Sequence, residues 1–252
     1  MLSAVILLSA IAGHVKPKPL TPGELRTNVA ACDSVQAGDV AVAAQRLHPF
    51  TLVRKLTLTR GDSAKPFGQQ AEALTSGEYR GREAMLDVLV FDTPNGKTVD
   101  SSWVDARTLR PLRFQSNNAS RAVELEFDGR QVRGRTTPGS GASTEINQQL
   151  GARAFEWNIF GLAISVLPLR AGYCASLPVY SDRAGRAVWY KVRVVGDTTI
   201  ERKSRGDEPV WEVVAAADTT VPAVRYWVSQ RHRVVSRVLV SEPGVSIMYA
   251  RD

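Results

Sequence analysis

The chain has 252 residues, of which 44% are hydrophobic and 23% are charged. This composition is typical of a folded domain and excludes a largely disordered protein. The net charge is +7, which by itself would allow an anionic partner. However, arginines such as Arg130, Arg133 and Arg135 recur at alternate positions, as they do on the solvated side of a sheet. We therefore expect no nucleic-acid partner.

The N-terminus carries a short apolar segment that ends on Ala10-Ile11-Ala12, a pattern similar to a signal-peptide cleavage site. The segment is too short to cross a bilayer, which requires about 20 apolar residues. No Lys or Arg precedes it, and a buried N-terminal strand or helix is the alternative. We expect residues 1–12 to be a signal peptide and the mature protein to be periplasmic or secreted.

Residues 13–49 are predicted to form a linker and a short helical segment. The linker is rich in proline, and Thr21-Pro22 followed by Glu24 is typical of a helix start. The remaining residues, 50–252, are predicted to form a single domain, since all-β domains often reach this size.

Cys32 and Cys174 are the two cysteines of the chain. In an exported protein they could form a disulfide that closes a long loop. Two buried free thiols are equally compatible with the sequence, because spacing along the chain does not reveal proximity.

From Phe50 onward, short segments alternate between apolar and polar residues, which predicts strands of an antiparallel sheet. Asn95-Gly96, Asp128-Gly129 and Glu242-Pro243-Gly244 separate such segments and predict tight turns. We expect about a dozen strands in two meanders. The fold class is mainly β (α+β), with one curved antiparallel sheet or a half-open β-barrel.

One phrase occurs twice in this pattern. Trp103-Val104 and Trp227-Val228 are each followed by two residues, an arginine, a polar turn and a further alternating segment. The repetition predicts two hairpins of the same kind, one in each half of the sheet.

An apolar helix is predicted near residues 144–167. Ile146, Leu150, Ala154 and Trp157 fall on one helical face, and the segment becomes more apolar up to Pro168. Such a helix must pack against the apolar face of the sheet, because it is too short to span a membrane. It could be a plain core helix or a lid over a cavity that accepts lipid.

The segments that carry a family resemblance are Leu167–Tyr173 with Leu177 and Tyr180, Val192–Gly196, and the hairpin from Trp227 to Arg237. Over roughly residues 85–250 the chain resembles a family of exported bacterial β-sheet proteins of unknown function. That family is related in fold to the lipoprotein-sorting carriers and receptors of the Lol pathway. The resemblance implies a strongly curved sheet whose concave side, in the carriers, accepts acyl chains. No contact residue of the carriers matches a position of this chain.

Residues suited to catalysis are sparse. The three histidines are His14, His48 and His232, and neither a metal-binding motif nor a nucleophile elbow is present. We expect no catalytic residues, no metal and no cofactor, and we predict that the chain is not an enzyme.

We predict an exported, monomeric binding protein that holds a lipid, an acyl chain or a lipidated partner. Trp157, Phe160, Leu162 and Ile164 are the candidate lining of its cavity. The alternative is a structural or scaffold protein of the cell envelope in which the helix fills the sheet. A carrier should contain a cavity of at least a few hundred Å³, whereas a scaffold should contain none.

Overall fold

The computed structural model describes residues 32–39, 44–182, 184–202, 206–217 and 223–251. Residues 1–12, assigned to a signal peptide, lie outside these ranges. The linker up to residue 31 and the helix start at Thr21 lie outside them as well, so the structure does not bear on these predictions.

The described residues form sixteen strands, one α-helix and one short 3-10 helix. In chain order they are β1 (Asp33–Ser34), η1 (Ala44–Arg46), β2 (Phe50–Arg60), β3 (Ser63–Tyr79), β4 (Arg82–Thr93), β5 (Gly96–Asp105), β6 (Pro111–Asn118), β7 (Arg121–Asp128), β8 (Gln131–Pro138), β9 (Thr144–Gln149), β10 (Phe155–Glu156), α2 (Phe160–Val166), β11 (Cys174–Ser181), β12 (Arg186–Ile200), β13 (Glu208–Ala216), β14 (Ala223–Ser229), β15 (Val235–Glu242) and β16 (Val245–Ala250).

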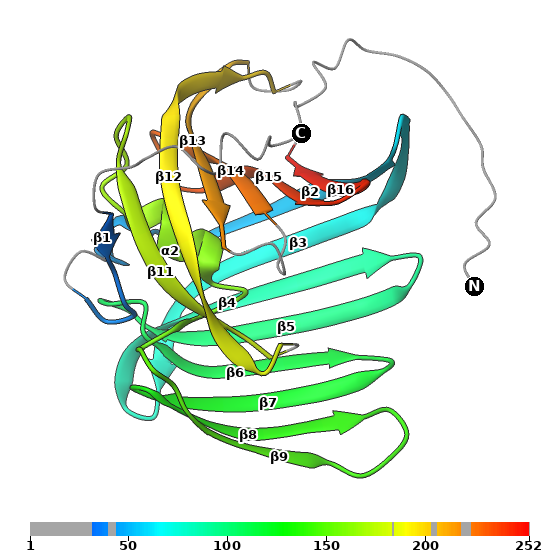
Figure 1. Cartoon of the computed structure of the whole chain (residues 1–252), viewed down its shortest axis with the longest axis vertical. Helices are drawn as coiled ribbons and strands as arrows, with labels where there is room; N and C mark the ends of the chain where they lie inside the picture. Colours follow the sequence, from blue (N-terminus) through cyan, green and yellow to red (C-terminus); the bar gives the residue numbers. More distant parts are fainter. Residues whose placement is uncertain (1–31, 40–43, 183, 203–205, 218–222, 252) are drawn as a thin grey trace.

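All sixteen strands belong to one sheet (Figure 1). It consists of two antiparallel meanders, β2–β9 and β11–β16, which are joined where β16 pairs with β2. The two shortest strands, β1 and β10, both pair in parallel with β11. The mainly β class and the two-meander arrangement are confirmed, with about four more strands than the dozen predicted.

The turns predicted at Asn95-Gly96 and Asp128-Gly129 lie where strands reverse, but each two-residue loop is displaced by one residue from the predicted pair. Asp128 pairs with Gln131, so the loop is Gly129 and Arg130, with Gly129 at φ +61°. At the first turn Thr93 pairs with Gly96, and the loop residues are Pro94 and Asn95. The turn residues therefore locate a hairpin correctly but not its register.

The sheet curls because its strands contain β-bulges, which bend and twist a strand locally. One lies where Leu56 of β2 pairs with Gly68 of β3, directly before a register shift. Gly68 has φ +131°, and a Cβ there would lie 2.1 Å from the carbonyl oxygen of Asp92. Only glycine permits this close approach of β3 to β4.

The repeated Trp-Val phrase corresponds to a repeated hairpin. Register shifts follow both Trp103 in β5–β6 and Trp227 in β14–β15. Six residues after each tryptophan, Leu109 (φ +52°) and Arg233 (φ +53°) adopt the left-handed conformation. Both residues donate their backbone N–H to the residue four positions earlier, at 3.0 Å. The prediction of two hairpins of one kind is confirmed.

The two ends of the curled sheet are connected by side-chain contacts. Tyr180 of β11 stacks edge-on against Phe127 of β7, with ring centroids 5.9 Å apart. Its hydroxyl donates to Gln148 of β9 at 3.1 Å, and Arg121 forms an ion pair with Asp182. Among the described residues, β9 and β11 share no strand pairing. The sheet is therefore strongly curved but not closed.

The prediction of a helix over residues 144–167 is wrong for most of its length. Residues Thr144–Gln149 form β9, which pairs with β8, and the helix is confined to Phe160–Val166. Every second residue of β9 is more exposed than its neighbour, as expected of an edge strand. The helical spacing of Ile146 and Leu150 was coincidental, because Gly151 separates them from the helix in a loop.

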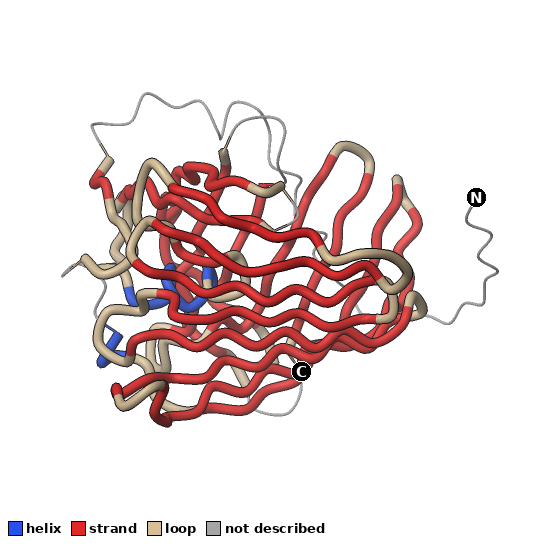
Figure 2. Tube along the Cα trace, turned by 90° about the horizontal axis from the view of Figure 1, so that it is seen from below, coloured by secondary structure: helices blue, strands red, loops and turns tan. Residues whose placement is uncertain are grey.

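The short helix α2 lies inside the curved sheet (Figures 1 and 2). Six of its seven residues are buried, and Phe160 and Ile164 have no exposed surface. They belong to the main hydrophobic core, with residues of η1 and of β10–β15. Among the described residues, no helix is both long and apolar enough to cross a bilayer.

Candidate functional site

A pocket of about 120 Å³ lies on the concave face of the sheet, beside the N-terminal end of α2. One wall comes from β2–β4, a second from the segment around α2, and a third from β14–β16. The lining residues are Arg54, Gln70, Glu72, Leu89, Phe91, Trp157, Asn158, Gly161, Leu162, Val224, Tyr226, Val235, Val238, Val240 and Tyr249. The pocket is therefore apolar on most sides, with polar groups gathered on the wall from β2 and β3.

Arg54 is the centre of this polar wall. Its side chain is 2% exposed and forms an ion pair with Glu72. The same guanidinium donates to Gln70 at 2.7 Å and to the backbone carbonyl of Val235 at 2.6 Å. The Nε of Arg54 has no hydrogen-bond partner among the described residues. Arg54 thus bridges β2, β3 and β15 while keeping one donor unused.

Two buried carboxyl groups lie beyond this ion pair. Burial and the nearby carboxylates of Glu72 and Glu156 raise the pKa of Asp87 well above its usual range, while Arg54 lowers it. Neither carboxyl oxygen of Asp87 has a hydrogen-bond partner among the described residues. Burial also raises the pKa of Glu156 to about 8, although hydrogen bonds from Asn158 and Ser102 lower it. Glu156 therefore carries a proton at neutral pH, and burial favours the protonated form of Asp87.

Aromatic rings connect the pocket to the core. Phe160 of α2 lies 5.1 Å from the Tyr190 ring and 6.0 Å from the Tyr226 ring, centroid to centroid. Trp157 stacks on both Phe160 and Tyr190. Burial raises the pKa of Tyr226, so its phenol stays neutral. These ring contacts hold the apolar walls in place.

The structure separates the four residues predicted to line the cavity. Trp157 and Leu162 do line the pocket. Phe160 and Ile164 belong to the packed core instead. The reason is the direction of the helix: its Gly161 and Leu162 face the pocket, whereas Phe160 and Ile164 are fully buried in the core.

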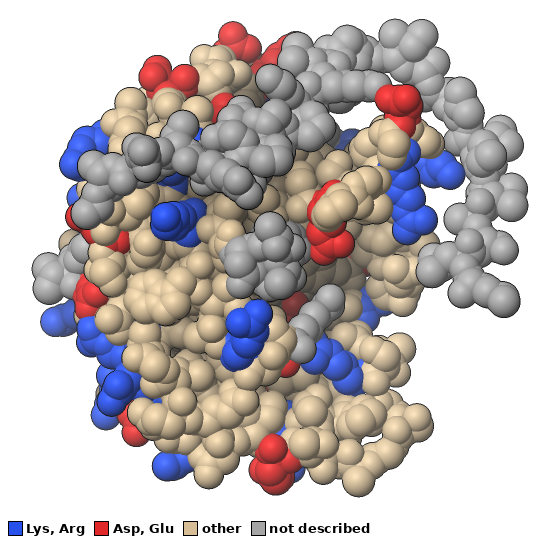
Figure 3. Space-filling model, in the orientation of Figure 1, with Lys and Arg blue, Asp and Glu red and all other residues tan. Residues whose placement is uncertain are grey.

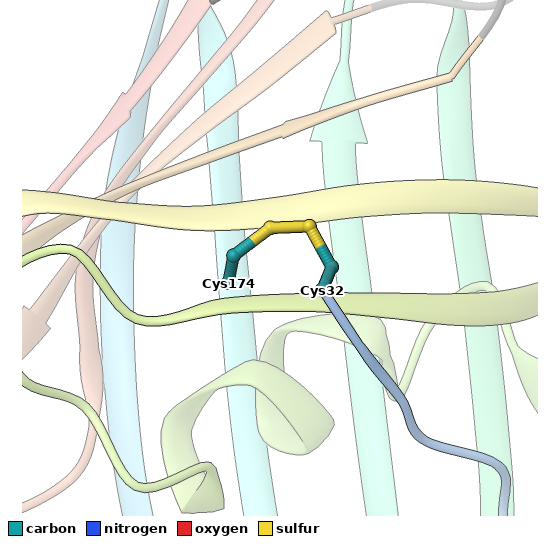
Figure 4. The surroundings of a disulfide bond; sticks show 2 residues. All are labelled: Cys32 and Cys174. Atoms are coloured by element: carbon teal, nitrogen blue, oxygen red, sulfur yellow. A yellow bond between two sulfur atoms is a disulfide. The ribbon is translucent and has the colours of Figure 1, made fainter. Parts of the chain in front are cut away.

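The structure joins Cys32 and Cys174 by a disulfide, with Cα atoms 4.9 Å apart (Figure 4). The bond links the segment before β1 to the start of β11. Backbone pairing continues from it, since Asp33 lies opposite Ala175. The disulfide therefore fastens the N-terminal segment along the outer edge of the sheet.

Residues suited to other chemistry are dispersed. His48 and His232 are exposed, and His14 lies outside the described residues. Within the described ranges, no three His, Cys, Asp or Glu side chains are placed to hold a metal ion. On the face shown in Figure 3, basic and acidic side chains are interspersed rather than gathered into one block.

Arg54 and Asp87 were not predicted from the sequence, although the pattern around Arg54 indicates its burial. Arg54 alternates with Leu52 and Leu56, which places it on their buried face. The sequence around Asp87 is misleading about which face is buried. Its aliphatic neighbours Leu86 and Val88 face the half-exposed convex side, whereas Asp87 itself faces the buried side.

Comparisons with known proteins agree with this architecture. The model of a family described as a protein of unknown function, DUF3108, matches residues 70–247. The chain belongs to the DUF3108 family. The matched region of this DUF3108 protein covers most of both meanders, from β3 to β16. No curated protein matches the chain.

The DUF3108 chain is also similar to a solved structure, a beta-barrel-like protein of the domain of unknown function DUF1849 from Brucella abortus. The similarity covers 82% of this chain and 97% of the other, with a TM-score of 0.55 and 13% sequence identity. At this identity the likeness concerns the fold alone. It supports the half-open, barrel-like description of the sheet.

Proposed function

We propose that the protein is an exported, non-enzymatic binding protein that holds the apolar part of a lipid, an acyl chain or a lipidated partner. The observation that carries the proposal is the pocket between α2, β2–β4 and β14–β16, which combines apolar walls with a small polar patch. Ligand pockets commonly have this composition. The sequence resembles a family that we expect to be related in fold to lipoprotein-sorting carriers, and such a relationship would fit the same function.

The disulfide supports the location of this function. Disulfides persist in oxidising compartments such as the bacterial periplasm and are rare in the cytosol. Cys32 and Cys174 are paired within a regular part of the sheet. The proposed site of action is therefore the periplasm or the exterior of the cell.

The size of the pocket limits what it could hold. A volume of about 120 Å³ corresponds to roughly ten water-sized probes. This is below the few hundred Å³ that we expected from the sequence for a carrier, and below the 300–1,000 Å³ or so of most pockets for drug-sized ligands. The proposal is therefore that the pocket holds one short length of chain, and that any longer ligand extends along the concave face.

Gly161 allows a direct test, because it lines the pocket. A Cβ at this position would make ordinary contacts with Val235 and Tyr226, at 3.5 and 3.6 Å. Gly161→Leu should therefore fill the pocket, while Gly161→Ala occupies less of it and serves as a graded control. We expect uptake of a fluorescent fatty acid by the unmodified protein, weaker uptake by Gly161→Ala and none by Gly161→Leu.

Native mass spectrometry of gently extracted protein gives an independent readout. A copurified lipid on the unmodified protein, lost in Gly161→Leu, supports the proposal. A clean ligand-free mass together with no uptake of the fluorescent fatty acid would contradict it.

A structural or scaffold role in the cell envelope is the second candidate. It is favoured by the packing of α2, whose side chains are almost entirely buried against the sheet. In that case, Gly161→Leu should leave the cellular function intact, whereas changes on the outer surface should impair it.

A further inference from the structure

We propose that the polar wall of the pocket recognises a neutral carbonyl group, such as the ester or amide of an acyl chain, rather than a free carboxylate or an amine. The groups that would bind it are the Nε of Arg54 and the side-chain amide of Asn158. This inference rests on the proposed function and adds the chemical class of the ligand's polar end.

Two unused donors carry the inference. Arg54 Nε and Asn158 Nδ2 are both buried, and neither has a hydrogen-bond partner among the described residues. Both residues line the same pocket, but neither donor atom is itself exposed to it, so a ligand oxygen would reach them only after a small rotation of the two side chains. A buried N–H without a partner costs about 1–3 kcal/mol, so a ligand that accepts from it gains affinity. Neither atom can accept a hydrogen bond, and the acceptors on the same wall, Gln70 and Glu72, already accept from Arg54, so the wall does not favour an ammonium group.

The charges around the pocket favour a neutral acceptor over an anion. Arg54 is already neutralised by its ion pair with Glu72. Asp87 and Glu156 follow behind it, and burial raises the pKa of both. Surroundings that disfavour the ionised form of their own carboxyl groups would disfavour a ligand carboxylate in the same way.

The experiment compares three probes with the same eight-carbon chain: methyl octanoate, sodium octanoate and octylamine. We expect methyl octanoate to bind at least about tenfold more tightly than either charged probe at pH 7.5. Binding should shift the Arg Nε–H and Asn side-chain signals of ¹⁵N-labelled protein, which reports on the two donors directly.

Asn158→Leu is the variant for the polar contact, because it keeps the size of the side chain and removes its amide. The backbone N–H of residue 158, which donates to Glu156 at 3.0 Å, is unaffected. The dissociation constant for methyl octanoate should rise by about three- to tenfold. Gly161→Leu should abolish binding of all three probes and is the control for the pocket itself.

The outcomes separate this inference from the function on which it rests. If octanoate or octylamine binds as tightly as the ester, and Gly161→Leu abolishes that binding, the carbonyl preference is wrong and the proposed function stands. The preference is also wrong if Asn158→Leu leaves ester affinity unchanged and no Arg Nε–H signal moves. If none of the probes binds to the unmodified protein, the proposed function fails and the preference fails with it.

Discussion

The hydroxyl of Ser102 donates a hydrogen bond to Glu156 at 2.9 Å. It connects β5 to the segment that crosses the concave face towards α2. The backbone N–H of Asn158 donates to the other carboxyl oxygen of Glu156. Glu156 is fully buried, with Asp100 and Asp182 as its charged neighbours. Its protonation state is therefore coupled to the stability of the fold.

The raised pKa of Glu156 predicts that the protein loses stability as the pH rises. The folded-state pKa is about 8, against an ordinary value of 4.5. Between these values the folded protein keeps a proton that the unfolded chain releases, so raising the pH favours unfolding. The loss contributed by Glu156 across this window is on the order of 5 kcal/mol. Asp87 contributes in the same direction. Urea unfolding at several pH values between 5 and 9 measures the slope.

Glu156→Gln is the matched control for this prediction. A glutamine carbonyl can accept from the Asn158 N–H, and the glutamine amide can donate to the Ser102 hydroxyl oxygen in place of the hydrogen bond that Glu156 accepts from Ser102. We expect the variant to resemble the unmodified protein near pH 5 and to be more stable above pH 8. Equal pH slopes for the two proteins would show that Glu156 does not titrate in this window.

The buried ion pair predicts a strong coupling between Arg54 and Glu72. Arg54→Met should destabilise the protein by about 3–5 kcal/mol, because it leaves the Glu72 carboxylate buried without its partner. Adding Glu72→Met to that variant should restore part of the loss. Chemical denaturation of both single variants and of the double variant measures the coupling. Strictly additive effects would contradict it.

The disulfide should stabilise the fold substantially. It joins residues 142 positions apart, and closing a loop of this length stabilises a protein by about 2–5 kcal/mol. Replacing both cysteines by serine should lower the free energy of unfolding by that amount. Adding a reductant should have the same effect on the unmodified protein and none on the variant. Any further loss in the variant would indicate that the serines disturb β1 or β11 directly.

The repeated hairpins predict different outcomes at two equivalent positions. The left-handed conformation costs residues other than glycine about 1–2 kcal/mol. A glycine at such a position removes this cost. Arg233→Gly should therefore change stability by less than about 1 kcal/mol, since this relief offsets the greater entropy of the unfolded chain. Leu109 has the same φ but no exposed surface. Leu109→Gly should cost about 2–5 kcal/mol through the cavity it leaves. Thermal unfolding of both variants gives the comparison.

Features determined by neighbouring residues could be predicted from the sequence. The alternation in β2 and the turns near Asn95 and Asp128 depend on local backbone preferences, and these hairpins are present. The equivalence of the Trp103 and Trp227 hairpins could also be predicted from the sequence. Its structural basis is local, since each hairpin contains its own bulge and its own left-handed residue.

Features determined by distant residues could not be predicted. Whether Thr144–Gln149 becomes a helix or a strand depends on the free edge of β8, with which it pairs. The burial of Asp87 depends on which face of β4 is concave, and the curvature of the whole sheet decides that. The ion pair of Arg54 with Glu72 required the pairing of β2 with β3. Of the four residues predicted to line the cavity, only Trp157 and Leu162 are among the fifteen residues that line the pocket.

The way the two sheet ends meet affects how the interior can change in size. Along the rest of the circumference, neighbouring strands are held by continuous ladders of backbone hydrogen bonds. At the junction of Gln148 with Tyr180 and Gly185, the hydrogen bonds involve the Gln148 side chain instead, at 3.1 and 2.9 Å. A few rotamer changes there would widen the enclosed space, whereas widening it elsewhere would require breaking a strand pair. The sheet is therefore most easily widened at this junction, and the position of the junction is set by the edge strand β9.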